Sequence, residues 1–158
     1  MKIGSFAIEP LLGEVAFANK ARFQKDRYDV VLKGIVLKNI DMKNLLDKKI
    51  FASDLSIDNT KAKIYHDLQK PLKKESKVGN YPSQMLMKLD IPIDISQVVL
   101  SNAFIQYKEK ETVSDSVGVV TFTGATLNIS NVTNVDESIK RNNSMTAVFN
   151  TQLLGTIP

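Results

Sequence analysis

The chain has 158 residues, of which 43% are hydrophobic and 24% are charged, values that fit one folded domain and exclude a disordered chain. It has no cysteine, which excludes disulfides, thiolate zinc sites and cysteine nucleophiles. The net charge is +4, but only three of the 21 basic residues are arginines (Arg22, Arg27 and Arg141), and the lysines are interspersed with 17 carboxylates. Because base recognition favours arginine, we expect no nucleic-acid binding.

The first 40 residues show the period of two that is typical of β-strands. Apolar side chains alternate at 6–8, 15–17 and 28–32, so each of these runs is predicted to be a strand. Ile35 and Leu37 continue the last run in the opposite parity, with Gly34 at the switch. A glycine at such a switch predicts a β-bulge or a bend.

Two short helices are predicted. Asp41 is placed to cap a turn that runs to Leu46, and Ser83 is placed to cap another that runs to Leu89. Neither exceeds about three turns, so helices are minor elements. Between them, residues 69–83 read QKPLKKESKVGNYPS, with two prolines and four lysines. This composition predicts a mobile basic loop that folding does not require.

An internal repeat joins two of the later strands. The segment LSIDNTKAKIY (55–65) matches VVLSNAFIQYK (98–108) without gaps. The aligned pairs are Leu55 with Val98, Ile57 with Leu100, Asn59 with Asn102, Ala62 with Ile105, and Ile64 with Tyr107. Asparagine tolerates a left-handed backbone, so the shared form is a strand, a polar corner and a second strand. Such a repeat indicates an array of β units, with chance similarity of alternating segments as the alternative.

These patterns predict an all-β fold for residues 1–158. We expect one domain with a mainly antiparallel, curved or groove-like sheet of repeated β units and one or two short helices.

No group of residues has the spacing of a catalytic or metal site. His66 is the only histidine, and its neighbour Asp67 is expected on the opposite face of a strand. Glu109 and Glu111 lie in the charge-alternating stretch KEKET, which is typical of a solvated strand end. Neither a phosphate-binding glycine loop nor a nucleophile elbow occurs. We therefore expect no enzymatic activity, no catalytic residue, no metal site and no cofactor.

Short motifs between residues 64 and 134 resemble a known family. The motifs are I-x-Y-x-E at Ile105, Tyr107 and Glu109; G-x-V-x-F at Gly118, Val120 and Phe122; I-x-N-x-T-N at Ile129, Asn131, Thr133 and Asn134; and I-Y-x-D-x-x-x-P at Ile64, Tyr65, Asp67 and Pro71. The first three motifs in this order, together with the fourth, which lies upstream of them, resemble the AsmA-like bacterial envelope proteins, in the form found in Bacteroidetes. The resemblance covers most of residues 30–158.

The resemblance implies a periplasmic protein that is anchored in the inner membrane and is involved in lipid transport or outer-membrane assembly. It also implies repeated β units that form a long curved sheet with an apolar groove, and it brings no catalytic residue with it. No run here approaches the roughly 20 apolar residues of a membrane span. We therefore expect this chain to be a fragment that pairs with flanking segments of a larger parent protein.

We predict that the apolar positions of the repeated unit line one surface that binds lipid acyl chains or a membrane. The candidates are Ile57, Ile64, Leu100, Ile105, Tyr107, Val120, Phe122, Leu127 and Ile129. In the alternative, the same positions form the closed core of a periplasmic structural or protein-interaction module, or of a surface adhesin. The sequence does not separate these readings, because a half-buried strand alternates identically in both.

Overall fold

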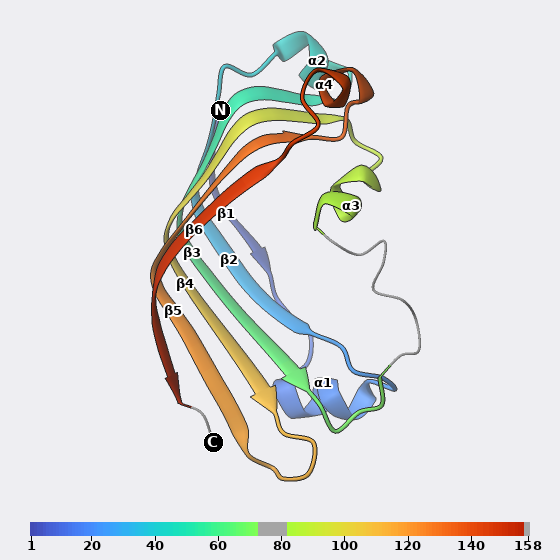
Figure 1. Cartoon of the computed structure of the whole chain (residues 1–158), viewed down its shortest axis with the longest axis vertical. Helices are drawn as coiled ribbons and strands as arrows, with labels where there is room; N and C mark the ends of the chain where they lie inside the picture. The colour runs from blue at the N-terminus through green and yellow to red at the C-terminus, as the bar shows by residue number, and fades with distance from the viewer. Residues whose placement is uncertain (73–81, 157–158) are drawn as a thin grey trace.

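The structure is a computed structural model that describes residues 1–72 and 82–156, and in it the chain forms a single curved β-sheet with short helices at its ends (Figure 1). The strands lie side by side in chain order, and only β3 and β4 are parallel. The predicted mainly antiparallel, curved β fold is confirmed. The elements are β1 (Lys2–Ile8), α1 (Glu14–Lys20), β2 (Arg27–Lys38), α2 (Met42–Leu46), β3 (Ile50–Asp67), α3 (Pro82–Met87), β4 (Ile93–Lys110), β5 (Val117–Thr133), α4 (Asp136–Arg141) and β6 (Thr146–Thr156).

The bend of the sheet coincides with residues that have a left-handed backbone. Gly34 in β2, Asn59 in β3, Asn102 in β4 and Gly124 in β5 all have φ between 51° and 59°. The strand register shifts at the same level in β2, β4 and β5, which confirms the bend predicted at Gly34. An extra residue of this kind inverts the alternation of side chains. Apolar residues on the two sides of the bend therefore remain on one face, although their spacing along the chain is odd.

A second row of irregular residues crosses the sheet nearer its upper end. Asn39 and Asn131 have positive φ values, and between them β3 and β4 each lack a bridge partner at Ser53 and Ser96. The hydroxyl of Ser53 donates to the carboxylate of its neighbour Asp54, a contact that a regular strand does not allow because adjacent side chains diverge. The alternation therefore inverts at this row as well.

The two copies of the sequence repeat lie on β3 and β4 and pair with each other in the parallel register. Leu55 lies beside Val98, Ile57 beside Leu100, and Ile64 beside Tyr107, the same pairs that the gapless alignment of the two segments gives. The two copies of the repeat are thus neighbouring strands, and their corner asparagines lie at the same level of the sheet.

Four helices of five to seven residues are present in the described part of the chain. Helix α2 begins where predicted, because the Asp41 carboxylate accepts a hydrogen bond of 3.0 Å from the backbone N–H of Asn44. The strand predicted at 15–17 is wrong, since these residues lie in α1, whose first turn closes when the N–H of Phe17 donates to Gly13. The spacing of Val15 and Phe17 fits either element, and the run EVAFANK has no β-branched residue after Val15 to oppose a helix.

The predicted loop at 69–83 is described only at its two ends. Residues 73–81 lie outside the described residues, so its predicted mobility stays a prediction. At its start, the Asp67 carboxylate accepts from the N–H of Gln69, and the carbonyl of Pro71 accepts from the N–H of Gln24. Helix α3 occupies the other end near the predicted position, but it begins at Pro82 and ends at Met87, so the prediction that Ser83 caps it is wrong.

Replacing the two bend glycines with alanine should separate backbone strain from crowding. Gly124→Ala adds a Cβ in open space at φ +56°, so only the left-handed strain of about 1–2 kcal/mol should be lost from the free energy of unfolding. Gly34→Ala should cost more, because its Cβ would also lie 3.3 Å from the Cβ of Asp58. Urea denaturation measures both, with Gly4→Ala as the control that should leave stability within about 0.5 kcal/mol. Equal stability of all three variants would contradict this account of the bend.

Candidate functional site

All nine predicted site residues lie on one face of the sheet, and it is the concave face. Cross-strand partners share a face, and the register places the candidates opposite one another. The rows they form are Ile129 beside Val98; Ile57, Leu100 and Leu127; Ile105 beside Phe122; and Ile64, Tyr107 and Val120. We call this face, between Leu55 and Ile64 on β3 and across all six strands, the apolar belt.

The belt is continuous across the bend. Phe122 lies below the bend and Phe149 above it, yet their ring centroids are 5.9 Å apart in an edge-to-face contact. On β6, Phe149 pairs with Leu127 and Leu153 pairs with Phe122, and four residues of one regular strand separate them. The rows above and below the bend therefore form one surface, as the sequence predicted.

The most buried residues at the bend are small. Thr60, Ala103 and Ala125 are 6%, 1% and 0% exposed, and they lie next to the corner residues on β3, β4 and β5. Small side chains fit the inside of a tight bend, where neighbouring strands converge, whereas the outside has room for large ones. Their burial results from the curvature of the sheet and identifies the belt as the concave face.

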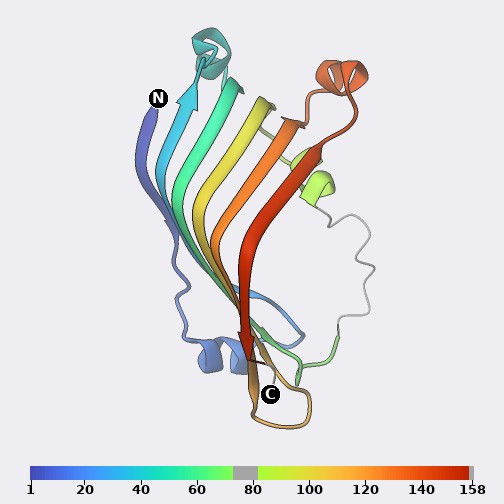
Figure 2. The same ribbon diagram turned by 60° about the vertical axis from the view of Figure 1, so that its left-hand side comes forward.

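No second layer covers the belt among residues 1–72 and 82–156. Helices α1, α2 and α4 lie at the two ends of the sheet, and α3 lies on the concave side below the upper end, apart from the strands (Figure 1, Figure 2). In the described part, no large side chain is fully buried, and the nine candidates are all half-buried. The chain exposes 10848 Å², whereas a compact monomer of 17.6 kDa exposes roughly 7,900 Å². The described residues thus form an open face and not the closed core of the alternative reading.

Sequence reasoning missed the margins of the belt. On the edge strands, Ile3, Phe6 and Ile8 of β1 and Phe149 and Leu153 of β6 belong to the same face through their pairing with β2 and β5. At the upper end, Ala52 and Ile95 join Ile35 and Leu37 in the buried cluster. The alternation in β1 and β6 contained the signal for the first group. The parity inversion near Ser53, which no glycine marks, hid the second group.

The two faces of the sheet differ in charge. All basic residues within the described strands lie on the convex face by register: Lys2, Arg27, Lys33, Lys38, Lys61, Lys63, Lys108 and Lys110. Among the acidic residues of the described strands, Glu109 lies on the concave face, in line with Ile105 and Tyr107. The concave face is therefore apolar in its centre and carries no lysine or arginine in the described strands.

Polar side chains border the belt at its lower end. The hydroxyl of Tyr107 donates to Glu109 over 2.8 Å, and that of Tyr28 donates to Asp26 over 2.9 Å. Asp26 also contacts His66, with 2.6 Å between Oδ1 and Nδ1. Burial and the bond to Glu109 raise the pKa of Tyr107, and burial and the bond to Asp26 raise the pKa of Tyr28. Both hydroxyls therefore stay protonated at neutral pH and act as donors.

One buried polar atom in the belt has no partner. The Oγ1 of Thr60 is buried and makes no hydrogen bond within the part of the chain that is described. An unsatisfied buried hydroxyl costs about 1–3 kcal/mol, so such atoms are uncommon unless a ligand or water meets them. Thr60 lies in the middle of the belt, where a ligand carrying a polar group could satisfy it.

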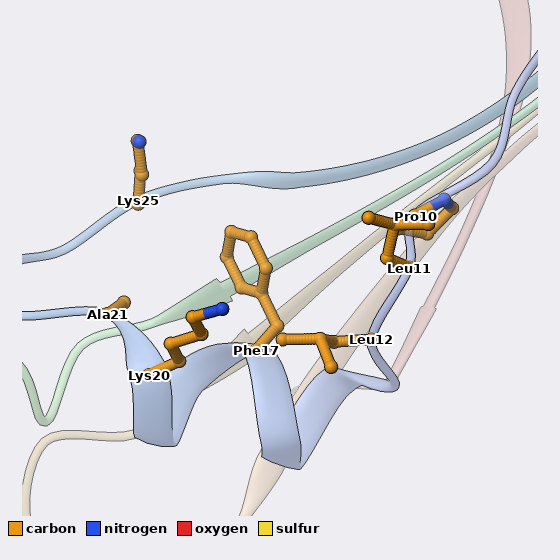
Figure 3. A pocket seen from close by; sticks show the side chains of 7 residues that line it. All are labelled: Pro10, Leu11, Leu12, Phe17, Lys20, Ala21 and Lys25. Carbon is orange, nitrogen blue, oxygen red and sulfur yellow. The ribbon is translucent and has the colours of Figure 1, made fainter.

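A separate hollow of about 380 Å³ lies beside α1, away from all nine candidates (Figure 3). Its walls come from the segment before α1, from the helix itself and from the start of the next loop. The lining residues are Pro10, Leu11, Leu12, Phe17, Lys20, Ala21 and Lys25. Because Leu11 is fully exposed, the hollow is open to solvent along one side.

The comparisons leave the chain without an assigned family. No protein-family model matches it, and the search of curated proteins finds no match. Within residues 1–72 and 82–156, no helix is long and apolar enough to span a membrane. The same residues contain no group of three or more histidines and carboxylates that could hold a metal ion.

Removing the unpartnered hydroxyl should stabilise the protein. Thr60→Val replaces Oγ1 with a methyl group of similar size, so the free energy of unfolding should rise by about 1 kcal/mol. Thr121→Val, on the convex face of β5, is the matched control and should change stability by less than about 0.5 kcal/mol. Thermal and urea denaturation measure both. A destabilised Thr60→Val variant would show that the hydroxyl has a partner in solution.

Alkaline pH should weaken the fold through the tyrosines. A tyrosine with a raised folded-state pKa contributes stability below its ordinary pKa of about 10 and loses it as the pH rises further. Tyr107→Phe should therefore show a smaller fall in urea midpoint between about pH 9 and about pH 11, roughly one unit either side of that ordinary value, than the parent protein. Lysine deprotonation is common to both proteins and cancels in the comparison. If the urea midpoint falls equally in the two proteins, Tyr107 does not contribute to the loss of stability at alkaline pH.

Proposed function

We propose that the apolar belt binds lipid acyl chains without catalysis, and that the chain is part of a larger envelope protein of the AsmA-like kind. The observation that supports the proposal is the open concave face, on which large apolar side chains remain half-exposed across all six strands. Soluble proteins rarely leave a contiguous apolar surface of this extent uncovered unless a ligand, membrane or partner meets it.

The dimensions of the belt fit an extended acyl chain. Six strands spaced about 4.8 Å apart give a width of roughly 24 Å from edge to edge. The ten residues from Leu55 to Ile64 give a height of roughly 30 Å at about 3.3 Å per residue. Each CH₂ group removed from water contributes about 0.8 kcal/mol, so a chain lying along the belt can bind without a charged anchor. The absence of basic residues on the concave face of the described strands is consistent with an apolar ligand.

The family, the periplasmic location and the inner-membrane anchor of the parent protein are proposals that rest on the motifs at 64–71 and 105–134. The curved sheet of repeated β units agrees with what the resemblance implies for the fold. A likeness of fold does not establish a function, so lipid transport and outer-membrane assembly depend on the belt and its test.

The edges of the sheet support pairing with flanking β segments. Strand β6 is exposed and carries neither a charged residue nor a proline, the two usual protections of an edge. Strand β1 has only Lys2. Because the belt reaches both edges, a strand added to either side would lengthen it.

A charge placed on the belt tests the proposal directly. Ile105→Glu puts a carboxylate in the centre of the face. The affinity for acyl chains should fall by more than about tenfold, because a bound chain must desolvate the carboxylate. The side chain is half-exposed, so the charge can hydrate and the melting temperature should change little. The measurement is displacement of a fluorescent fatty acid together with a melting curve.

Gln106→Glu is the matched control, because it adds the same charge one residue away on the convex face. It should bind the probe like the parent protein. If both variants bind normally, the belt is not the binding surface. If Ile105→Glu unfolds while Gln106→Glu does not, the belt is covered in solution and the closed-core reading gains.

A further inference from the structure

The segment between β1 and β2, residues 9–26, forms a lobe at the lower end of the sheet that we call the basal lobe (Figure 1, Figure 2). Polar contacts on its inner side hold it against the strand ends, so its position is fixed. The contacts are Arg27 Nε to the Leu12 carbonyl at 2.8 Å, Lys108 to Glu14 at 3.0 Å, Gln24 Nε2 to the Lys70 carbonyl at 2.9 Å, and His66 to Asp26 at 2.6 Å.

The outer side of the basal lobe is apolar and open to solvent. Leu11 is 101% exposed and Val15 is 70% exposed. Leu11 lines the hollow of about 380 Å³, in which Phe17 and Leu12 lie side by side, whereas Val15 is not among the lining residues (Figure 3). Single exposed apolar side chains are ordinary, but Leu11 borders an apolar hollow on an element that polar contacts hold against the sheet.

The charge on this outer side is positive. Lys20 and Lys25 border the hollow, and Arg22 lies between them in the sequence with its guanidinium 5.4 Å from the ring of Phe23. None of these three cations forms an ion pair within the described residues. Glu14 and Asp26 are held inward by Lys108 and His66, which leaves Glu9 as the acidic residue of the lobe that is not paired to the sheet.

We propose that the basal lobe docks on the surface of an anionic lipid bilayer, with Leu11 inserted at the headgroup boundary and Lys20 and Lys25 against lipid phosphates. Exposed apolar side chains next to basic ones are the composition of interfacial membrane elements. A polyanion in water would satisfy the lysines but offers no apolar phase for Leu11. The docked lobe sets the lower end of the apolar belt beside the bilayer.

Co-sedimentation of the whole chain with vesicles tests the docking. Binding should be strong to phosphatidylcholine vesicles that contain about a third phosphatidylglycerol and weak to pure phosphatidylcholine, because each basic residue near an anionic surface contributes roughly fivefold. The double variant Lys20→Gln/Lys25→Gln should therefore lose roughly 25-fold in partition. Leu11→Asp should lose at least about tenfold, since a buried leucine contributes 1.5 kcal/mol or more.

Val113→Asp is the control, because Val113 is 90% exposed in the hairpin after β4, at the same end of the sheet, and no lysine adjoins it in the sequence VSDS. It should leave binding unchanged, and melting curves confirm that all variants fold. Equal binding to both kinds of vesicle, or full binding by Leu11→Asp, would overturn the proposal. Displacement from vesicles by inorganic phosphate at constant ionic strength would also overturn it, in favour of a simple phosphate site.

The docking does not depend on the acyl-chain function of the belt. Ile105→Glu should keep its binding to the anionic vesicles, because Ile105 lies outside the basal lobe. Loss of vesicle binding in this variant would show that the belt, and not the lobe, holds the bilayer.

Discussion

The structure depends on one backbone constraint, the left-handed residue that each central strand carries at the bend. Without it, the odd spacing from Leu100 to Ile105 would put these two side chains on opposite faces. With Asn102 at φ 51°, both lie on the concave face. The same device recurs at Asn59 and Gly124, so the bend and the continuity of the belt have a common cause. A substitution that removes one of these left-handed residues would therefore change both the curvature of the sheet and the face on which the apolar side chains lie.

The open belt raises the question of what stabilises a single-layer sheet. Layered domains bury the apolar face of one sheet against another element, and that burial is the main favourable term in folding. Here the concave curvature replaces part of the second layer, because Ala103 and Ala125 are buried by their own neighbours. The convex face is held by polar contacts such as the pair between Lys108 and Glu14. A lipid or a flanking segment that covered the remaining apolar surface would stabilise the fold by removing that surface from water.

The sequence predicted most of the strands, the bend at Gly34 and the common face of the nine candidates, because each follows from a period of two and its inversion. It did not predict α1, since Val15 and Phe17 fit both periods. It did not locate the upper inversion, because Ser53 and Ser96 have no distinctive backbone preference. Whether the face is open or covered depends on the packing of layers, which alternation does not encode. The convex position of the lysines could have been read from the sequence, since Lys61 and Lys63 alternate with Ala62 and Ile64.

The direction of the strands explains why the belt can extend beyond the sheet. Strands β1, β3, β4 and β6 run one way and β2 and β5 the other, so each half of the chain is a three-stranded meander and the parallel pair β3–β4 joins the halves. In the second half, β6 occupies the place that β3 has in the first. A strand of the β4 type could therefore pair with β6 in the way that β4 pairs with β3, and its apolar residues would fall at the level of Phe149. The unprotected edge at β6 thus follows from the order of the strands, because β6 is the counterpart of β3, and β3 is covered by the pairing of β4.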